Sequence, residues 1–142
     1  MNEKQTNTPT QVISEESLHG DTEANDLQLE KNEREIKALR IKTMNDVFRQ
    51  TFVGGSVMLT QGIQHMPDRD MEAIITQVRQ FNDFTEENDP HGEHDFGIIK
   101  HNGESVYWKI DYYNKAMDGG SEDPSDPKLT KRVLTIMRAS EY

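Results

Sequence analysis

Hydrophobic residues recur with the period of an α-helix in two stretches of the chain. The first starts near residue 27 and stops at the Gly54-Gly55 pair, and one stripe of it consists of Ile36, Leu39, Thr43, Val47 and Phe48. The second is expected to start near Pro67, because the fixed φ of proline suits a first helical turn. Its stripe consists of Met71, Ile74, Ile75, Val78 and Phe81. The pattern therefore predicts two helices, each with one face toward a core.

Four other stretches have the composition of β-strands. Residues 56–61 are apolar on both faces, which favours a strand near the middle of a sheet. Residues 96–101 and 104–113 flank Asn102-Gly103, a pair that suits the two positive-φ positions of a type I′ hairpin turn. Residues 133–137 are β-branched or apolar and predict a final strand well inside the sheet.

The two-residue turn also predicts which hairpin residues face each other. The expected core face carries Ile99, Gly97, Val106, Trp108 and Ile110, with the indole over the glycine. Extending the same pairing toward the start of the hairpin sets His94 opposite Asp111. These two residues would share a face with Phe96 and Lys109, so the register predicts a mixed polar group on that face.

Together these elements predict an α+β fold with two layers. Two main helices would pack on a small, mainly antiparallel sheet in the order α-β-α-β-β-β. Residues 1–26 are polar, show neither period, and are interpreted as a flexible acidic tail. Residues 27–142 are expected to form a single domain, because 142 residues with 32% hydrophobic content suffice for one modest core.

Composition narrows the possible functions. The chain has no cysteine, which excludes disulfides, thiolate zinc sites and cysteine nucleophiles. No apolar run approaches the roughly 20 residues of a membrane span, and the N-terminus lacks the order of a signal peptide, so a cytoplasmic location without membrane contact is expected. Of the net charge of −10, residues 1–35 carry −6 and residues 36–142 carry −4. Direct nucleic-acid binding is not expected, because it draws on clustered Lys and Arg.

The most unusual stretch of the sequence is residues 83–97, DFTEENDPHGEHDFG. It contains two histidines, His91 and His94, and no Lys or Arg. Its carboxylates are Asp83, Glu86, Glu87, Asp89, Glu93 and Asp95. The Asn, Asp, Pro and Gly in its centre are typical of a turn, because their side chains or φ preferences shape the local backbone. A shaped turn explains much of this stretch without any catalysis.

Three segments carry a resemblance to a known family. They are FTEENDPHGEHDFG in the acidic stretch, WKIDYY at residues 108–113, and DPKLTKRVLTIM at residues 126–137. With these segments the chain resembles a family of small bacterial proteins, mainly alphaproteobacterial, defined as a domain of unknown function. The resemblance covers residues 36–142 and implies a shared domain without an assigned activity.

One functional hypothesis is a hydrolase that depends on a divalent metal. His91, His94 and Asp111 would supply ligands, with Glu93 or Asp95 nearby, and an activated water would attack a phosphoester or an amide. In a metal-free version His94 would be a general base oriented by Asp111, with Lys109 stabilising negative charge. The spacing matches none of the established metal motifs. A cross-strand hydrogen bond between His94 and Asp111, with Lys109 screening the acids, explains the same residues structurally.

The favoured hypothesis is an acidic protein-binding module that needs no cofactor. The acids expected to contact the partner are Asp83, Glu86, Glu87, Asp89 and Glu93. Dense negative potential speeds encounter with a basic surface, and proteins that handle nucleic acids often carry such surfaces. The concrete version is an inhibitor of the phage or plasmid type, anti-restriction or anti-CRISPR, that occupies the groove in place of DNA or RNA.

Overall fold

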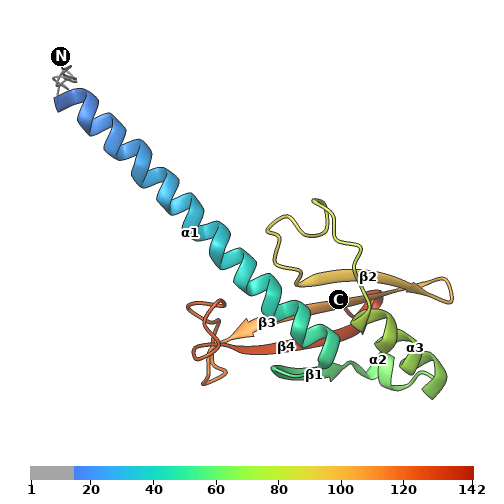
Figure 1. Cartoon of the computed structure of the whole chain (residues 1–142). Helices are drawn as coiled ribbons and strands as arrows, with labels where there is room; N and C mark the ends of the chain where they lie inside the picture. The colour runs from blue at the N-terminus through green and yellow to red at the C-terminus, as the bar shows by residue number, and fades with distance from the viewer. Residues whose placement is uncertain (1–14) are drawn as a thin grey trace, which may run out of the picture. The chain divides into compact units, whose positions relative to one another are not determined.

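The computed structural model describes residues 15–142, with side chains from residue 22 onward. The chain divides into two units, residues 1–35 and residues 36–142. Helix α1, Glu15–Thr51, begins 12 residues before the helix that the sequence predicts (Figure 1). Most of the predicted flexible tail, residues 1–26, lies outside the described residues, so that interpretation remains a prediction. The described residues 22–35 are all exposed.

The second unit contains a four-stranded mixed sheet, and its fold confirms the predicted α+β class and element order. Its strands are β1 Gly55–Leu59, β2 Phe96–His101, β3 Glu104–Tyr113 and β4 Lys131–Arg138. They lie in the order β1-β4-β3-β2, with β1 parallel to β4 and the other neighbours antiparallel. Helix α3, Asp68–Arg79, forms the second main helix, and short helices α2 (Gln61–Gln64) and η1 (Ala139–Glu141) complete the unit. None of the described helices is both long and apolar enough to span a membrane.

One hydrophobic core joins the helices to one face of the sheet. The residues buried there come from α1, α2, α3 and the strands: Phe48, Ile63, Ile74, Val78, Ile99, Val106, Trp108, Ile110, Leu134 and Ile136. Residues Met71, Ile75 and Phe81 of the predicted second stripe pack against this core. The prediction for α3 is therefore confirmed, including its start after Pro67.

The hairpin follows the predicted register. Asn102 and Gly103 have φ of 52° and 79°, as a type I′ turn requires. Gly97 pairs with Trp108, and a Cβ on this glycine would overlap the indole ring. The expected core face is confirmed, because all five of its residues are buried. The final strand is also confirmed as internal, since β4 lies between β1 and β3.

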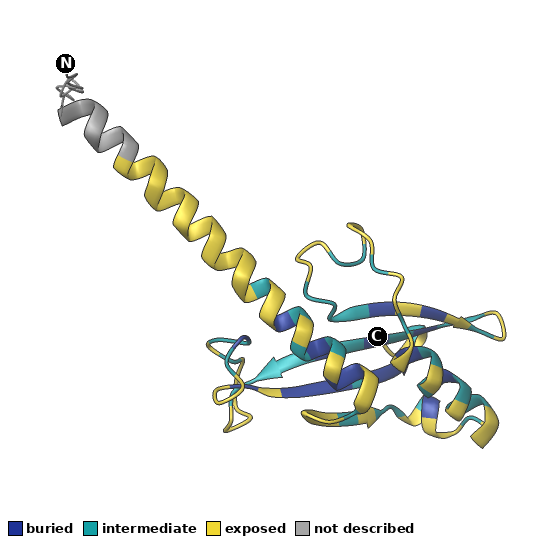
Figure 2. Cartoon of the chain, in the orientation of Figure 1, coloured by how far each residue is buried: buried dark blue, intermediate teal, exposed yellow. Residues whose placement is uncertain are grey.

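The buried face of α1 differs from the prediction. Ile36, Leu39 and Val47 are each about half exposed, as Figure 2 also shows for much of this helix. Phe48 is buried as predicted, but the other buried residues among the described part of α1 are Ile41, Asn45 and Arg49. Polar side chains can be buried in a core when other groups form hydrogen bonds with them. The period of the hydrophobic residues gives no information about such partners. For this reason the stripe prediction was correct at Phe48 and wrong at Ile36, Leu39 and Val47.

The position of β1 also differs from the prediction. This strand lies at one edge of the sheet and pairs only with β4. Its Met58 side chain is 57% exposed, so the strand is not covered on both faces. It ends at Leu59, and α2 begins at Gln61. Apolar residues on both faces indicate neighbours above and below a strand, but they carry no information about how many strands lie beside it.

Candidate functional site

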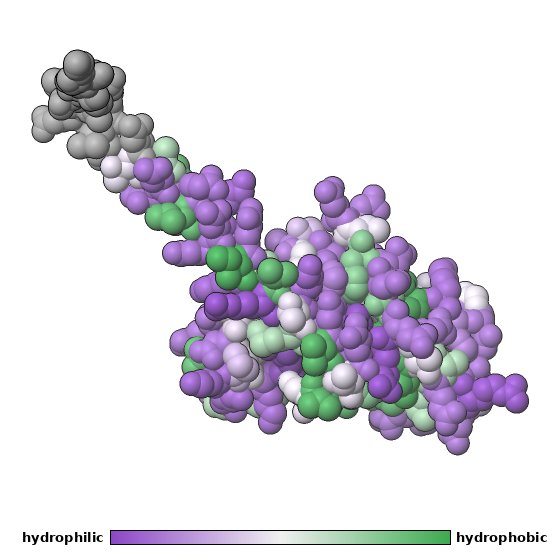
Figure 3. All heavy atoms as spheres, viewed as in Figure 1, coloured by the Kyte–Doolittle hydropathy of each residue, from purple (hydrophilic) through white to green (hydrophobic). Residues whose placement is uncertain are grey.

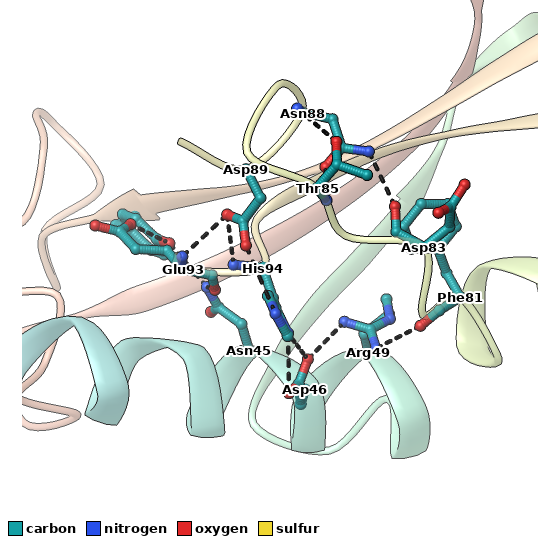
Figure 4. Close-up of polar contacts among 11 residues, drawn as sticks. Asn45, Asp46, Arg49, Phe81, Asp83, Thr85, Asn88, Asp89, Glu93 and His94 are labelled. Carbon is teal, nitrogen blue, oxygen red and sulfur yellow. Dashed lines mark hydrogen bonds and ion pairs between the residues drawn. The ribbon is translucent and has the colours of Figure 1, made fainter. Parts of the chain in front are cut away.

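The acidic loop between α3 and β2, residues 82–95, is held in shape by its own side chains (Figure 4). Thr85 and Asn88 exchange hydrogen bonds, with the Thr85 N–H donating to the Asn88 amide oxygen at 2.9 Å. The Asp89 carboxylate accepts from the backbone N–H groups of Glu93 and His94 at 3.0 and 3.1 Å. The side-chain hydrogen bonds to the backbone that the sequence predicts for a turn are therefore present, and they give the loop one defined backbone path.

His94 fastens this loop to helix α1. Its Nδ1 lies 2.8 Å from Oδ1 of Asp46, and its Nε2 lies 3.6 Å from Oδ2 of Asp89. The imidazole stacks on the Phe84 ring, with centroids 3.6 Å apart and planes within 3°. His94 has a φ of +54°, so the backbone has left strand geometry before β2 begins. The hairpin register consequently does not extend to His94, and its imidazole contacts Asp46 and Asp89 rather than the expected Asp111.

Arg49 lies beneath the loop as a buried cation. Its side chain is 1% exposed, and its two terminal nitrogens donate to the Asp46 carboxylate and to the Phe81 carbonyl, each at 3.0 Å. The guanidinium carbon is 5.3 Å from the centre of the Phe84 ring and 5.1 Å from that of Trp108. Asp46 therefore joins two groups, the buried Arg49 and the loop residue His94, at one carboxylate.

A second network holds the end of the loop. The Asn45 amide donates to the Glu93 carbonyl at 2.9 Å and to the Tyr112 hydroxyl at 2.8 Å. That hydroxyl in turn donates to the Glu93 carboxylate at 2.9 Å, while Arg132 Nε donates to the Asn45 amide oxygen at 2.8 Å. Burial raises the pKa of Tyr112 and lowers the pKa of Arg132. Burial, reinforced by the neighbouring Glu93 carboxylate, also raises the pKa of Asp95.

The five acids predicted to contact a partner fall into two groups. Asp83, Glu86 and Glu87 are exposed. Asp89 and Glu93 are bonded within the protein, and only 6% of the Asp89 side chain is exposed. The outward charge of the loop therefore comes from the first three acids, while the other two shape its backbone.

The residues of the hydrolase hypothesis do not form one site. Lys109 Nζ forms an ion pair with Oδ2 of Asp111 at 2.8 Å, and this contact raises the pKa of Lys109. Both line a cavity of about 460 Å³ that His94 does not line. His91 is exposed in the loop. Across the described part of the chain, no three His, Asp or Glu side chains are grouped as a metal site would need.

The sequence prediction missed several residues that the structure brings to the loop. Asn45, Asp46 and Arg49 all come from α1, and their only sequence signal is that Asn45 and Arg49 fall on the same helical face as Ile41 and Phe48. These contacts join residues that are 32 to 48 positions apart in the sequence, and patterns over a few neighbouring positions do not show such contacts.

A second His–Asp pair was also missed. His101 Nε2 lies 2.9 Å from Oδ1 of Asp70, and this contact lowers the pKa of the Asp70 carboxyl. Gln77 lies 3.3 Å from the other ring nitrogen. The pair fastens the hairpin turn to α3, which is a structural role.

Comparison with protein families identifies most of the second unit. Residues 59–141, which are 83 of the 142 residues, match the family described as "Protein of unknown function (DUF3768)". The chain belongs to the DUF3768 family. The DUF3768 region contains α2, α3, the acidic loop, the hairpin and β4, and it starts after α1. The resemblance inferred from the sequence was expected to start at residue 36, whereas the family match starts at residue 59. Comparisons with curated proteins and with solved structures gave no match.

Proposed function

We propose that this protein is an acidic binding module whose loop, residues 82–95, docks on a basic surface of another protein. The observation that carries the proposal is the combination of exposed charge and a fastened backbone. Asp83, Glu86 and Glu87 are exposed on a loop that contains no Lys or Arg. The side-chain oxygens of Asn88 and Asp89 accept hydrogen bonds from backbone N–H groups of the loop and so define the path of that backbone.

Preorganisation makes such a loop suitable for recognition. A partner that binds a loop of defined shape does not have to order it, so less of the interaction free energy is lost. Three carboxylates without a neighbouring cation attract a basic surface and repel nucleic acid. The partner class that fits this chemistry is a protein with a basic groove for DNA or RNA.

The concrete form of the proposal is an inhibitor that occupies such a groove, as expected of an anti-restriction or anti-CRISPR protein of phage or plasmid type. In this form the acids of the loop take the place of phosphates on the groove of the target. The inhibited protein would lose affinity for its nucleic acid when this domain is added.

The test compares two variants of equal net charge. One neutralises the loop, with Asp83→Asn, Glu86→Gln and Glu87→Gln, and the control neutralises three exposed acids elsewhere, with Asp68→Asn, Glu72→Gln and Glu122→Gln. Immobilised wild type and control should retain the same basic proteins from a lysate and release them by roughly 0.5 M salt, where charges are screened within a few ångströms.

The loop variant should retain much less of these proteins. Equal retention by the loop variant, or retention that salt does not affect, would contradict the proposal. A captured protein that passes this comparison should then be displaced from its DNA or RNA by the wild type and not by the loop variant. An unaltered complex with nucleic acid would refute the inhibitor form while leaving binding itself intact.

A further inference from the structure

Strand β2 is an edge of the sheet, because it pairs only with β3. In an antiparallel pair, every second residue directs its N–H and C=O toward the neighbouring strand. His101 does so, since it closes the two-residue turn with Glu104. Asp95 also does so, and its carbonyl accepts from the Ile110 N–H at 2.8 Å. The backbone groups that point away from β3 are therefore those of the even-numbered residues of β2: Phe96, Ile98 and Lys100.

The outer side of β2 lacks most of the features that protect edge strands. Among the described residues, none forms a backbone hydrogen bond with these outward N–H and C=O groups. The strand contains no proline, and its pairing with β3 runs through residues 96–101 without a bulge. Ile98, at its centre, is 44% exposed. Natural edge strands are commonly blocked by proline, bulges or charges, so β2 has the features of a strand that pairs with another chain.

The charges of this strand favour a second copy of itself as the partner. Asp95 directly precedes β2, and Lys100 lies near its other end. In an antiparallel pair of identical strands, the acidic end of each strand lies beside the basic end of the other. A parallel pair would bring the like ends together, which costs free energy.

We propose that β2 of one copy of the chain pairs antiparallel with β2 of a second copy, about a two-fold axis at Ile98. The two four-stranded sheets then form one continuous sheet. A two-fold axis makes the contact self-complementary, so that each copy uses the same strand and no further copy can add at this edge.

The register follows from the outward groups. With the axis at Ile98, this residue pairs with itself, and Phe96 pairs with Lys100 of the second copy. All of the outward groups of β2 are then used, and an ammonium group lies beside an aromatic ring. An axis at Phe96 or at Lys100 pairs fewer of these groups, and the latter also sets two lysines directly opposite each other.

Backbone hydrogen bonds and the Ile98 pair would supply most of the affinity. On the side that Figure 3 draws, hydrophobic side chains of the second unit lie in separate groups among hydrophilic ones. Such a surface does not offer the broad apolar area of an obligate dimer. The wild type should therefore change from monomer to dimer between roughly 1 µM and 1 mM, the range of weak to moderate dissociation constants.

Sedimentation of the full chain tests the dimer. Ile98→Lys sets two lysines opposite each other at the axis, so this variant should remain a monomer throughout that range. Met58→Lys is the matched control, because it places the same side chain on the other edge strand, at a residue that is 57% exposed. The control should form the dimer of the wild type. Circular dichroism of each variant should match that of the wild type.

A mixture of two variants tests the register. Ile98→Glu should also be a monomer alone, because two carboxylates then face each other. An equimolar mixture of Ile98→Lys and Ile98→Glu should form a heterodimer at the wild-type concentration, because residue 98 lies opposite itself only when the axis passes through it.

Four outcomes would each overturn the proposal. They are a wild type that stays monomeric up to 1 mM, an Ile98→Lys variant that still dimerises, a Met58→Lys variant that loses the dimer, and a mixture of the two Ile98 variants that stays monomeric. The first would leave the edge of β2 without a second copy as its partner, and the third would place the contact at β1 instead.

Discussion

Replacing Asp46 by Asn should destabilise the domain and release the acidic loop. The carboxylate lies 2.8 Å from His94 Nδ1 and 3.0 Å from an Arg49 nitrogen. Asn has nearly the same shape and can still accept a hydrogen bond, so the change removes charge rather than volume. It leaves Arg49, which is buried beside Phe84 and Trp108, without its carboxylate partner.

The expected loss follows from the two contacts. Hydrogen bonds to charged groups contribute about 1.5–3 kcal/mol and neutral ones about 0.5–1.5 kcal/mol, so each contact should lose about 1 kcal/mol. Removing one partner of a fully buried ion pair costs about 3–5 kcal/mol, but the Asp46 side chain is 27% exposed and water offsets part of this cost. The free energy of unfolding should therefore fall by about 2–3 kcal/mol.

Urea unfolding by linear extrapolation measures this change, with Glu72→Gln on the exposed side of α3 as the control. Trp108 is the only tryptophan, and its ring lies against Arg49 and near Phe84, so its fluorescence reports directly on the cluster. A loss below about 0.5 kcal/mol, the size of an ordinary surface effect, would refute the reasoning. So would an equal loss in the control.

Three further predictions concern packing, pH and metal. Gly97→Ala should lower the free energy of unfolding, measured in urea, by about 1–3 kcal/mol, because the added Cβ would overlap Trp108. Gly119→Ala is the control and should lower it much less, because there is space for its Cβ. Equal losses in the two variants would contradict this packing. Asp95 has a raised pKa in the folded protein, so its protonated form contributes stability that is present at low pH and is lost as pH rises through that pKa. Asp95→Asn, which cannot ionise, should therefore be more stable than the wild type at pH 7 and should lose this advantage below pH 3.8, the ordinary pKa of an Asp carboxyl. Thermal unfolding of both proteins across this pH range checks the sign of the difference in stability. Calorimetric titration with Mg²⁺, Mn²⁺, Zn²⁺ and Ca²⁺ should show no stoichiometric binding. If the wild type binds a metal and the His94→Ala variant does not, that result would support the hydrolase hypothesis.

Local chemistry carried most of the correct predictions. The hairpin register followed from the φ requirement of Asn102-Gly103 and from the alternation of side chains along a strand. The start and core stripe of α3 followed from Pro67 and a regular apolar period. The turn chemistry of the acidic loop was likewise readable, since its hydrogen bonds join residues three to five apart.

The candidate site itself depended on contacts between distant parts of the chain. His94 was recognised as a candidate residue, but its partner Asp46 lies 48 positions earlier, on a helix whose buried face was predicted correctly only at Phe48. That face contains Asn45 and Arg49, which became buried because Glu93, Tyr112, Arg132 and Phe81 provide hydrogen-bond partners.

The sequence by itself determined the α+β class, the hairpin register, α3 and the shape of the acidic turn, because each depends on backbone preferences within a few residues. Only the tertiary structure decided which face of α1 is buried, where β1 lies in the sheet, and that His94 contacts Asp46 rather than Asp111. The physical reason is that the large majority of buried polar side chains have hydrogen-bond partners, and partners on other elements, such as those of Asn45, meet only when the chain is folded.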